Sequence, residues 1–555
     1  MIKYFFNKHM YKAVQGAVKL TPPPALEAYF QWARARGIRW DKIEYPVLFP
    51  PGYIGSRAIA PIQPGEPIII APNPSLLTTK VALNSEMEEI YDQNKDLFSE
   101  RNSRYEDLVL ITFLIWEKYK GENSEWYDFI VSQPECPEVL QDWSIEEIKE
   151  LQDEDLEYES KSQLATEMKI YSSWKKVIKK YPQYFKPAMM VYKEFNWAYK
   201  IIGTRTFGKF VPYATFTPIG EFLNHNNTET FYCYVHPDEV PDSSSRYDGF
   251  KDFEDHDDDI AEKNPIISVT CQTLVSVNKE GNTNFDESLK NKFNKIKKEA
   301  EEIDGVEFME KMNKEEYQPP GVLLSESDEK QLRIVAGPND RYEEGSEVYM
   351  SYGRYSNRQL LCVYGFSLKD NIYNYARIKP NLTHFTNNPE QIRHIRSFKL
   401  DRPCAFKIRA QHLCLDLIRA IRALRWKSSM SEKAFFNPAD IELELETFEH
   451  AKFILERWLS CYPTSYEQDL QLLQENPPMR LYFALTYRSE VKRILKKQIQ
   501  LINVTIGILL KLRTQMDLDL ALIPIEEYEQ QEEVQENRRA IDSYLRSLKS
   551  SQLSS

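Results

Sequence analysis

The chain has 555 residues and a mass of 65.4 kDa, more than one hydrophobic core normally organises, so two or three domains are expected. Its net charge of −13 and pI near 5.4 argue against nucleic-acid binding, which needs a basic surface to displace counterions, and favour a basic protein partner. The seven cysteines form no paired framework and no Cys-x-x-Cys spacing, and no apolar run is long enough to cross a bilayer, so we expect no disulfide scaffold, no metal and no membrane partner.

Residues 1–24 are predicted to form a flexible basic tail. The first twenty residues contain Lys3, Lys8, Lys12 and Lys19 and no acidic residue, a pattern faintly similar to a mitochondrial presequence. Arginine and serine, which such presequences use, are missing there. We therefore expect a cytoplasmic location, with the nucleus as an alternative and the mitochondrion as a less favoured one.

A short helix and a set of short strands are predicted next. Leu26, Tyr29, Phe30 and Ala33 recur at helical spacing, which predicts an amphipathic helix. Residues 47–79 then form short β-like runs separated by Pro and Gly turns. This segment is the expected first part of a small sheet.

Two long segments of different composition follow. Residues 85–200 are rich in helical patterns, with Leu108, Ile111 and Ile115 on one face of a predicted helix. Residues 236–330 are acidic and polar and cannot bury much apolar surface. We interpret the first as a helical insertion and the second as a mostly flexible insertion that contains one charged helix.

The C-terminal part is predicted to be a helical bundle over 371–525. Three apolar stripes at helical spacing succeed one another in this region. They are Cys414, Leu417, Ile421 and Leu424; Phe448, Ala451, Leu455 and Trp458; and Val491, Leu495, Ile499, Ile502, Ile506 and Leu509. Residues 526–555 are charged and are expected to fray.

Two short motifs indicate the function. The first is Glu221-Phe-Leu-Asn-His-Asn-Asn227, and the second is Ser351-Tyr-Gly353 followed by Val363-Tyr-Gly-Phe366. Alone, an Asn-rich run indicates a polar turn and a Tyr-Gly-Phe run indicates a buried aromatic. In this order, the two resemble the halves of the active site of SET-domain methyltransferases.

Further segments resemble one SET subfamily, the Rubisco large-subunit methyltransferase-like enzymes. The helical insertion, the run Trp197–Phe207 and the C-terminal segment from Tyr462 are similar to that subfamily. The resemblance implies an α+β fold, with small mixed sheets of a SET domain over 25–370. It also implies that the helical C-terminal domain over 371–525 binds a protein substrate.

The resemblance implies that S-adenosylmethionine is the methyl donor. Gly52–Ala58 is similar to the family's glycine turn, but Tyr53 or Ile54 stands where its first glycine is usual, so this loop is expected to take a different course. Arg205 is the residue expected to reach the donor's carboxylate. The residues carried over as donor-binding are Gly55, Ser56, Arg57, Arg205, Asn224, His225 and Tyr364.

The catalytic candidates are Tyr364, Tyr352 and Tyr234. Methyl transfer to an amine needs alignment of the reacting atoms and a neutral nucleophile, and a narrow aromatic channel favours the neutral amine by excluding water. Tyr364 takes the place of the family's Tyr-Gly-Phe tyrosine, whereas Tyr352 either packs behind the donor or faces the channel. Tyr232 and Tyr234 share one strand face, and one of them is expected to line the channel.

The sequence therefore predicts an S-adenosylmethionine-dependent protein-lysine N-methyltransferase that acts on a specific, non-histone protein as a monomer. A histidine acceptor is the alternative within enzymes. A catalytically silent SET fold that only binds proteins is the alternative of another class. A helical scaffold with accidental motif matches is a third.

Overall fold

The computed structural model describes residues 9–208, 211–239, 329–397, 405–425, 438, 440–514 and 532–552. All structural statements below concern these residues. Most of the acidic insertion expected over 236–330 lies outside them. Helices and small sheets share the described chain, so the predicted α+β class is confirmed.

Short strands make up the sheets, and they are concentrated in the first half of the described chain. The strands are β1 (His9–Tyr11), β2 (Val18–Lys19), β3 (Ile43–Phe49), β4 (Tyr53–Ala58), β5 (Pro67–Pro72), β6 (Leu77–Thr78), β7 (Thr206–Phe207), β8 (Thr215–Phe216), β9 (Asn224–His225), β10 (Phe231–Val235), β11 (Gln331–Val335), β12 (Asp340–Tyr342), β13 (Glu347–Met350), β14 (Ala376–Ile378) and β15 (Phe406–Ile408). The largest sheet has the order β2-β3-β4-β13-β9, and a three-stranded sheet has the order β10-β11-β5. Strands distant in sequence are therefore neighbours in both sheets.

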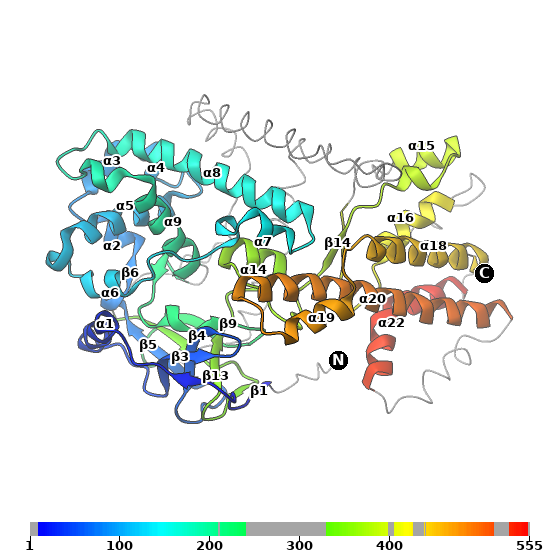
Figure 1. Ribbon diagram of the computed structural model, residues 1–555, viewed down its shortest axis with the longest axis horizontal. Helices are drawn as coiled ribbons and strands as arrows, with labels where there is room; N and C mark the ends of the chain where they lie inside the picture. The colour runs from blue at the N-terminus through cyan, green and yellow to red at the C-terminus, as the bar shows by residue number, and fades with distance from the viewer. Residues whose placement is uncertain are drawn as a thin grey trace.

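Helices cover the sheets and form the C-terminal part (Figure 1). The α-helices are α1 (Pro24–Ala35), α2 (Thr79–Leu83), α3 (Glu88–Gln93), α4 (Lys95–Phe98), α5 (Tyr105–Lys120), α6 (Tyr127–Ser132), α7 (Ile145–Lys149), α8 (Glu154–Ile178), α9 (Tyr192–Arg205), α14 (Asn357–Tyr364), α15 (Pro389–Ser397), α16 (Leu415–Arg425), α18 (Ile441–Ser460), α19 (Tyr466–Gln474), α20 (Met479–Arg513) and α22 (Glu532–Gln552). Short 3-10 helices are η1 (Asn73–Ser75), η2 (Gly121–Asn123), η3 (Leu140–Asp142), η4 (Pro187–Met190), η5 (Gly220–Phe222) and η8 (Leu382–Phe385).

The N-terminal segment is not the free tail that was expected. From residue 9 it joins the sheets, because β1 pairs in parallel with β12 and β2 pairs with β3. The ring of Tyr11 stacks on Tyr342 with centroids 4.6 Å apart. Strand pairing and aromatic stacking hold this basic segment, and neither can be inferred from its charge.

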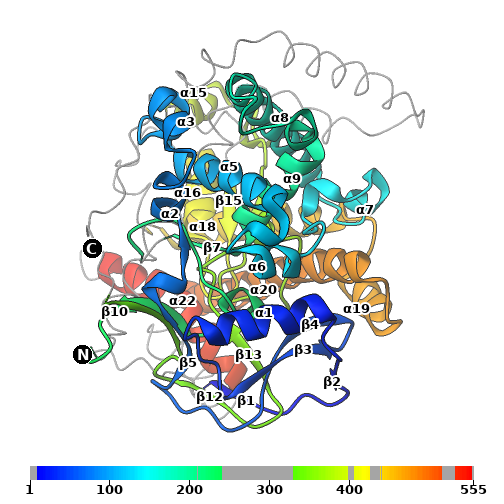
Figure 2. The ribbon, with the colours of Figure 1, turned by 90° about the vertical axis from the view of Figure 1, so that its left-hand side faces the viewer.

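The predicted helix after the tail is α1, and it lies beside α6 (Figure 2). Its buried residues Leu26, Tyr29 and Ala33 are those of the predicted stripe. Trp32 Nε1 donates to the Glu125 carbonyl at 2.9 Å, which joins α1 to the helical insertion. The helix thereby connects the sheet region to the helices beside it.

The helical insertion predicted over 85–200 is present as α3 to α9. Helix α5 is buried along most of its length, and Leu108, Ile111 and Ile115 belong to the main core as expected. Inside that core, Trp174 Nε1 donates to Thr112 Oγ1 at 3.0 Å. The buried indole group therefore has the partner that its burial requires.

A second core joins the C-terminal helices to the middle of the helical insertion. Leu140, Ile148 and Leu156 of the insertion share one cluster of buried side chains with Leu455 and Leu495. Helix α20 contributes more residues to this cluster than any other element, and α16, α18 and α22 add to it. The C-terminal bundle is therefore packed directly against the insertion.

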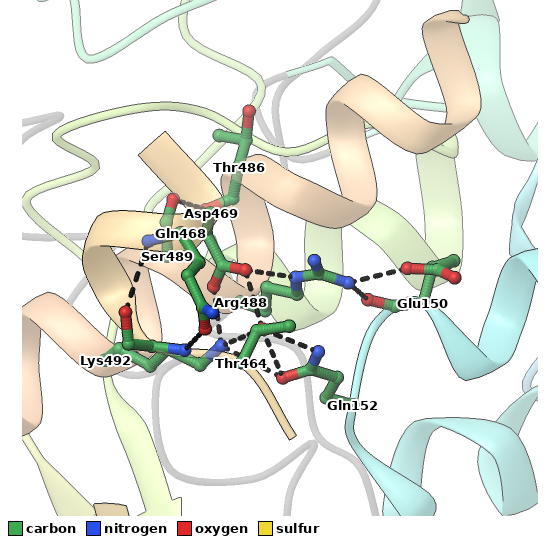
Figure 3. Close-up of polar contacts among 10 residues, drawn as sticks. Glu150, Gln152, Thr464, Gln468, Asp469, Thr486, Arg488, Ser489 and Lys492 are labelled. Atoms are coloured by element: carbon green, nitrogen blue, oxygen red, sulfur yellow. Dashed lines mark hydrogen bonds and ion pairs between the residues drawn. The ribbon is translucent and has the colours of Figure 1, made fainter. Parts of the chain in front are cut away.

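A buried polar network crosses the same boundary (Figure 3). Asp469 accepts from Arg488 Nε at 2.9 Å and pairs with Lys492 Nζ at 2.5 Å. Arg488 Nη1 donates to the Glu150 carboxylate at 2.7 Å, and Lys492 Nζ donates to Gln152 Oε1 at 2.9 Å. The network connects α19 and α20 to the residues that follow α7.

The expectation that the chain frays beyond residue 526 is wrong for 532–552, which form α22. Ala540, Ile541, Tyr544, Leu545 and Leu548 are buried on one face of this helix and belong to the second core. The charged residues of this segment lie mainly on the exposed face of α22. Its apolar face packs against the other helices of the bundle.

Candidate active site

The first motif lies in a parallel strand pair that ends directly before the second motif. Strand β9 lies beside β13 with Asn224 opposite Tyr349 and His225 opposite Met350. Immediately after β13, the Ser351 amide donates to the Thr230 carbonyl at 3.0 Å. Motif halves that are far apart in sequence are thus adjacent, as predicted.

His225 is buried beneath the second motif. Its ring is 3% exposed and stacks on Tyr352 with centroids 5.1 Å apart. Its Nδ1 accepts the Tyr352 backbone N–H at 3.0 Å, so the proton of the neutral ring lies on Nε2. Burial lowers the pKa of His225 to about 4, despite a contact with the Met350 carbonyl that raises it. His225 is therefore neutral at physiological pH and acts as a hydrogen-bond acceptor through Nδ1.

Asn224 is fixed from the side of β4 and β13. Its Nδ2 donates to the Ile54 carbonyl at 3.0 Å and to Glu347 Oε1 at 2.9 Å. A Cβ atom at Gly55 would lie 2.6 Å from both Asn224 Nδ2 and Glu347 Oε1. A glycine is thus needed at position 55 so that a neighbouring group can come close to its backbone. In this structure that group is the Asn224 side chain.

Glu347 is the buried anchor of this arrangement. Besides Asn224, it accepts from the hydroxyls of Tyr53 at 2.7 Å and Tyr349 at 2.8 Å. Burial raises the pKa of Glu347, although its three donors oppose that change. Sequence reasoning did not identify Glu347, because its link to Asn224 depends on the β9–β13 pairing.

Two predicted donor-binding residues have internal partners instead. The Ser56 hydroxyl is fully buried and donates to the Phe222 carbonyl at 3.0 Å. Arg57 pairs with Glu44, its cross-strand neighbour on β3, through Nε at 2.8 Å. Both side chains are therefore engaged in holding β4, and donor binding by these two residues stays a prediction.

Arg205, at the end of α9, lies beside the first motif. Its Nη1 donates to the Glu221 carbonyl at 3.3 Å, and Tyr29 donates to Glu221 Oε1 at 2.6 Å. Burial raises the pKa of Glu221 to about 7, although Tyr29 and Arg205 both lower it. Within the described residues, Arg205 Nε and Glu221 Oε2 are buried without a hydrogen-bond partner, as is His225 Nε2.

Tyr364 ends helix α14 inside a cluster of aromatic rings. Its ring centroid lies 4.9 Å from Tyr352, 6.2 Å from Tyr355 and 6.1 Å from Phe366. The Tyr352 hydroxyl donates to the Leu223 carbonyl at 2.8 Å. The Tyr364 hydroxyl has no hydrogen bond to any described residue. The Tyr352 hydroxyl is therefore engaged within the protein, whereas that of Tyr364 remains available to a ligand.

Tyr232, rather than Tyr234, is the strand tyrosine near Tyr364. Both lie on the same face of β10, as the alternation predicted, but Tyr234 is 4% exposed and belongs to the main core. Burial raises the pKa of Tyr364 well above its ordinary value, and the nearby Tyr355, Tyr352 and Tyr232 raise it further. Tyr355 was not identified from the sequence, because no motif position marks it.

The C-terminal bundle reaches this aromatic cluster through the start of α20. Phe483 lies 6.3 Å from Phe366, ring centroid to ring centroid. Ser367 Oγ donates to the Phe483 carbonyl at 2.7 Å. The aromatic cluster is therefore bordered by both halves of the chain.

The described residues show two further absences. They contain no group of three His, Cys, Asp or Glu side chains close enough to hold a metal ion. No helix among them is both long and apolar enough to span a bilayer.

The site thus belongs to an α+β protein in which an Asn-His strand and a Tyr-Gly-Phe helix end share one aromatic cluster. A comparison with protein families matches residues 389–495 to the family described as Rubisco LSMT substrate-binding. Residues 389–495 are therefore similar to Rubisco LSMT substrate-binding domains, and the predicted resemblance to the Rubisco large-subunit methyltransferase-like subfamily is confirmed through them.

Solved structures provide a weaker likeness. The chain is similar to the SET domain of LSMT crystallised with lysine and AdoHcy, with 16% identity, a TM-score of 0.49 and coverage of 86% of this chain and 91% of that one. It is also similar to Rubisco LSMT bound to AdoMet, with 16% identity, a TM-score of 0.48 and coverage of 88% and 93%. A comparison with curated proteins gave no match.

Proposed function

We propose that this chain is a SET-type, S-adenosylmethionine-dependent methyltransferase that modifies a lysine of a specific, non-histone protein. The observation that carries the proposal is the Tyr364 hydroxyl, which lies among aromatic rings without a hydrogen bond to any described residue. The Asn-His strand that ends beside this cluster supports the same proposal. So does the Rubisco LSMT substrate-binding domain, which implies a protein substrate.

Tyr364 suits the orientation of an amine rather than its deprotonation. Because the pKa of Tyr364 is raised by burial, the phenol stays neutral at physiological pH. Its oxygen can accept an N–H of the neutral lysine amine, which leaves the amine lone pair for the methyl carbon. The lysine loses its proton to solvent before transfer, and the positive charge of the sulfonium passes to the methylated amine.

The residues beside the first motif fit the polar end of the donor. The Arg205 guanidinium is suited to the donor's carboxylate, and Arg205 Nε is a buried donor without a partner in the described chain. Glu221 Oε2 is a buried acceptor that also lacks a partner in the described chain, and it suits the cationic amine of the donor. Asn224 would contribute its backbone, since both N–H groups of its side chain are already engaged. When bound, the donor supplies the activated methyl group.

The aromatic cluster provides the alignment and the exclusion of water that the reaction requires. The rings of Tyr352, Tyr355 and Phe366 pack around the ring of Tyr364. A lysine placed there is desolvated, which favours its neutral form. Correct placement of the reacting atoms can itself lower the barrier by several kcal/mol.

A single experiment tests the proposal. The purified chain is titrated with S-adenosylmethionine by calorimetry and then incubated with labelled donor and a proteome extract, and the modified residue is identified by mass spectrometry. We expect donor binding and a labelled lysine. Tyr364→Phe should retain donor affinity within about twofold and lower the transfer rate by about a hundredfold, because only the orienting hydroxyl is lost.

Other outcomes identify the alternatives. Label on a histidine would replace the lysine proposal with histidine methylation. Failure to bind the donor would indicate a silent binding module. Donor binding with full transfer by Tyr364→Phe would reject the role of the hydroxyl. Val363→Ala, which changes an exposed neighbour on the same helix, is the matched control.

A further inference from the structure

Helix α14, which presents Tyr364, is held by a buried ion-pair cluster at its other end. Arg358 is 5% exposed near the start of the helix. Its Nη1 lies 3.2 Å from Asp153 Oδ2, and its Nη2 lies 2.6 Å from Glu159 Oε2. At about 3.6 residues per turn, Arg358 and Tyr364 point about 120° apart around the axis. One therefore faces the helical insertion while the other faces the aromatic cluster.

Asp153 connects three helices at one carboxylate. It caps the N-terminus of α8, accepting the Leu156 N–H at 3.1 Å, and it accepts the Tyr487 hydroxyl of α20 at 2.6 Å. Burial acts to raise the pKa of Asp153, but Arg358, Tyr487 and the Leu156 amide outweigh it and hold the pKa below its ordinary value. Asp153 is thus ionised at neutral pH and can hold Arg358.

Other contacts of α14 hold the two ends of the helix. Asn357 bonds the loop after the helix, accepting the Leu368 N–H at 3.1 Å and donating to the Leu368 carbonyl at 2.7 Å. At the far end, a Cβ on Gly365 would overlap the Glu138 carbonyl. These contacts fix the ends of α14, while buried packing of Leu361 and Cys362 and the ion pairs of Arg358 hold its side against its neighbours.

We propose that Arg358 is a positioning residue for Tyr364, and that Asp153 transmits the placement of the C-terminal domain to α14 through Tyr487. This inference rests on the proposed function. Loss of the Arg358 contacts would let α14 rotate or shift, which would displace the Tyr364 hydroxyl from the amine. Because catalysis depends on near-ideal placement, the turnover rate would fall while donor affinity would not.

The test uses graded variants of the full chain. Arg358→Met removes the charge, Arg358→Lys keeps the charge but contacts one carboxylate, and Tyr487→Phe removes one hydroxyl. Hydrogen exchange of the peptide covering α14 is measured, together with kcat and KM for the acceptor and Kd for the donor. We expect faster exchange of α14 and a kcat lower by about tenfold or more in Arg358→Met, with smaller effects in the other two.

The matched control for the loss of a buried pair is Arg422→Met. Arg422 Nε pairs with Glu444 at 2.7 Å inside the C-terminal bundle, and the Arg422 side chain is as buried as that of Arg358. Arg422→Met should lower overall stability without specific acceleration of exchange in α14. Equal α14 exchange in Arg358→Met, Tyr487→Phe and the wild type, or equal acceleration in the control, would overturn the inference.

The two proposals fail separately. If the wild type transfers no methyl group, the proposed function fails, while hydrogen exchange still reports whether Arg358 holds α14. If transfer occurs but all Arg358 variants retain the wild-type kcat, only the positioning role fails. If Tyr487→Phe alone leaves α14 unchanged, the link to the C-terminal domain is rejected.

Discussion

Glu221 shows how one buried carboxylate can make the site sensitive to pH. Its Oε1 is bound by Tyr29, but its Oε2 has no partner in the described chain. Burial is the largest cause of its raised pKa of about 7. A protonated Glu221 offers no negative charge to a cationic amine, whereas an ionised one does. The charge state of the residue thus changes within the physiological range.

Replacement of this carboxylate should alter how stability depends on pH. A raised pKa means that the folded chain retains the Glu221 proton from its ordinary value of 4.5 up to about 7, while the unfolded chain releases it. The contribution of Glu221 to the free energy of unfolding is therefore fully present below pH 4.5 and is lost as the pH rises through 7. The difference in unfolding free energy between wild type and Glu221→Gln should fall over this interval, as urea denaturation at several pH values would measure.

A second variant checks the assignment. The Tyr29 hydroxyl lowers the pKa of Glu221, so Tyr29→Phe should move the transition to higher pH. A flat difference between wild type and Glu221→Gln from pH 4 to 8 would contradict the prediction.

At the level of elements, the end of α14 depends on one glycine. Gly365 has a φ of 76° and follows the last helical residue, Tyr364. In addition, a side chain there would meet the Glu138 carbonyl and would lie 3.1 Å from the Val139 Cα. The helix end must therefore be left-handed and must also lie directly against the backbone of the helical insertion.

Gly365→Ala should destabilise the chain by at least about 1–3 kcal/mol, because left-handed strain and overlap with backbone act together. Gly507→Ala in α20 is the matched control, since a Cβ there meets nothing within 4 Å. The control should be neutral or stabilising by up to about 1 kcal/mol, because alanine favours a helix interior. Thermal unfolding of both variants measures the difference, and equal values would reject the argument.

Sequence reasoning predicted elements better than side-chain partners. The stripes of α1 and the bundle helices followed from periodicity, and the meeting of the two motifs followed from the resemblance to SET domains. Alternation placed Tyr232 and Tyr234 on one face of β10. Which of the two is near Tyr364 depends on where along the strand the aromatic cluster lies. The partner of Arg57 depends on the register of β3 and β4, and that of Ser56 depends on the placement of β4 beside Phe222, neither of which the sequence alone specifies.

Helix α22 is a different case, since its signal was present in the sequence. Ala540, Ile541, Tyr544, Leu545 and Leu548 recur at helical spacing. The surrounding charges concealed this stripe. Strand β1 had no comparable local signal, because its pairing with β12 joins distant residues.

At the level of the whole molecule, the buried network of Asp469 joins the C-terminal bundle to the helical insertion. Asp469 and Lys492 are fully buried, and Arg488 is nearly so. Asp469 therefore pairs with both cations, and Arg488 has a second carboxylate partner in the more exposed Glu150 (Figure 3). Removal of one member of such a cluster leaves uncompensated buried charge.

Asp469→Ala should lower the unfolding free energy by about 3–5 kcal/mol, because Arg488 and Lys492 lose their shared anion. Asp416→Ala, at an exposed pair with Arg419, should change it by less than about 1 kcal/mol. Denaturation in low and high salt measures both. A small effect of Asp469→Ala, or a strong dependence of that effect on salt, would contradict burial of the network.

The pairing of β9 with β13 has a consequence for synthesis of the chain. His225 and Met350 are 125 positions apart, so the Asn-His strand leaves the ribosome long before its neighbour exists. At about 5–20 residues per second, that wait lasts roughly 6–25 seconds. During translation, β9 must therefore wait without its β13 neighbour, and a nascent chain halted before residue 350 cannot assemble the proposed active site.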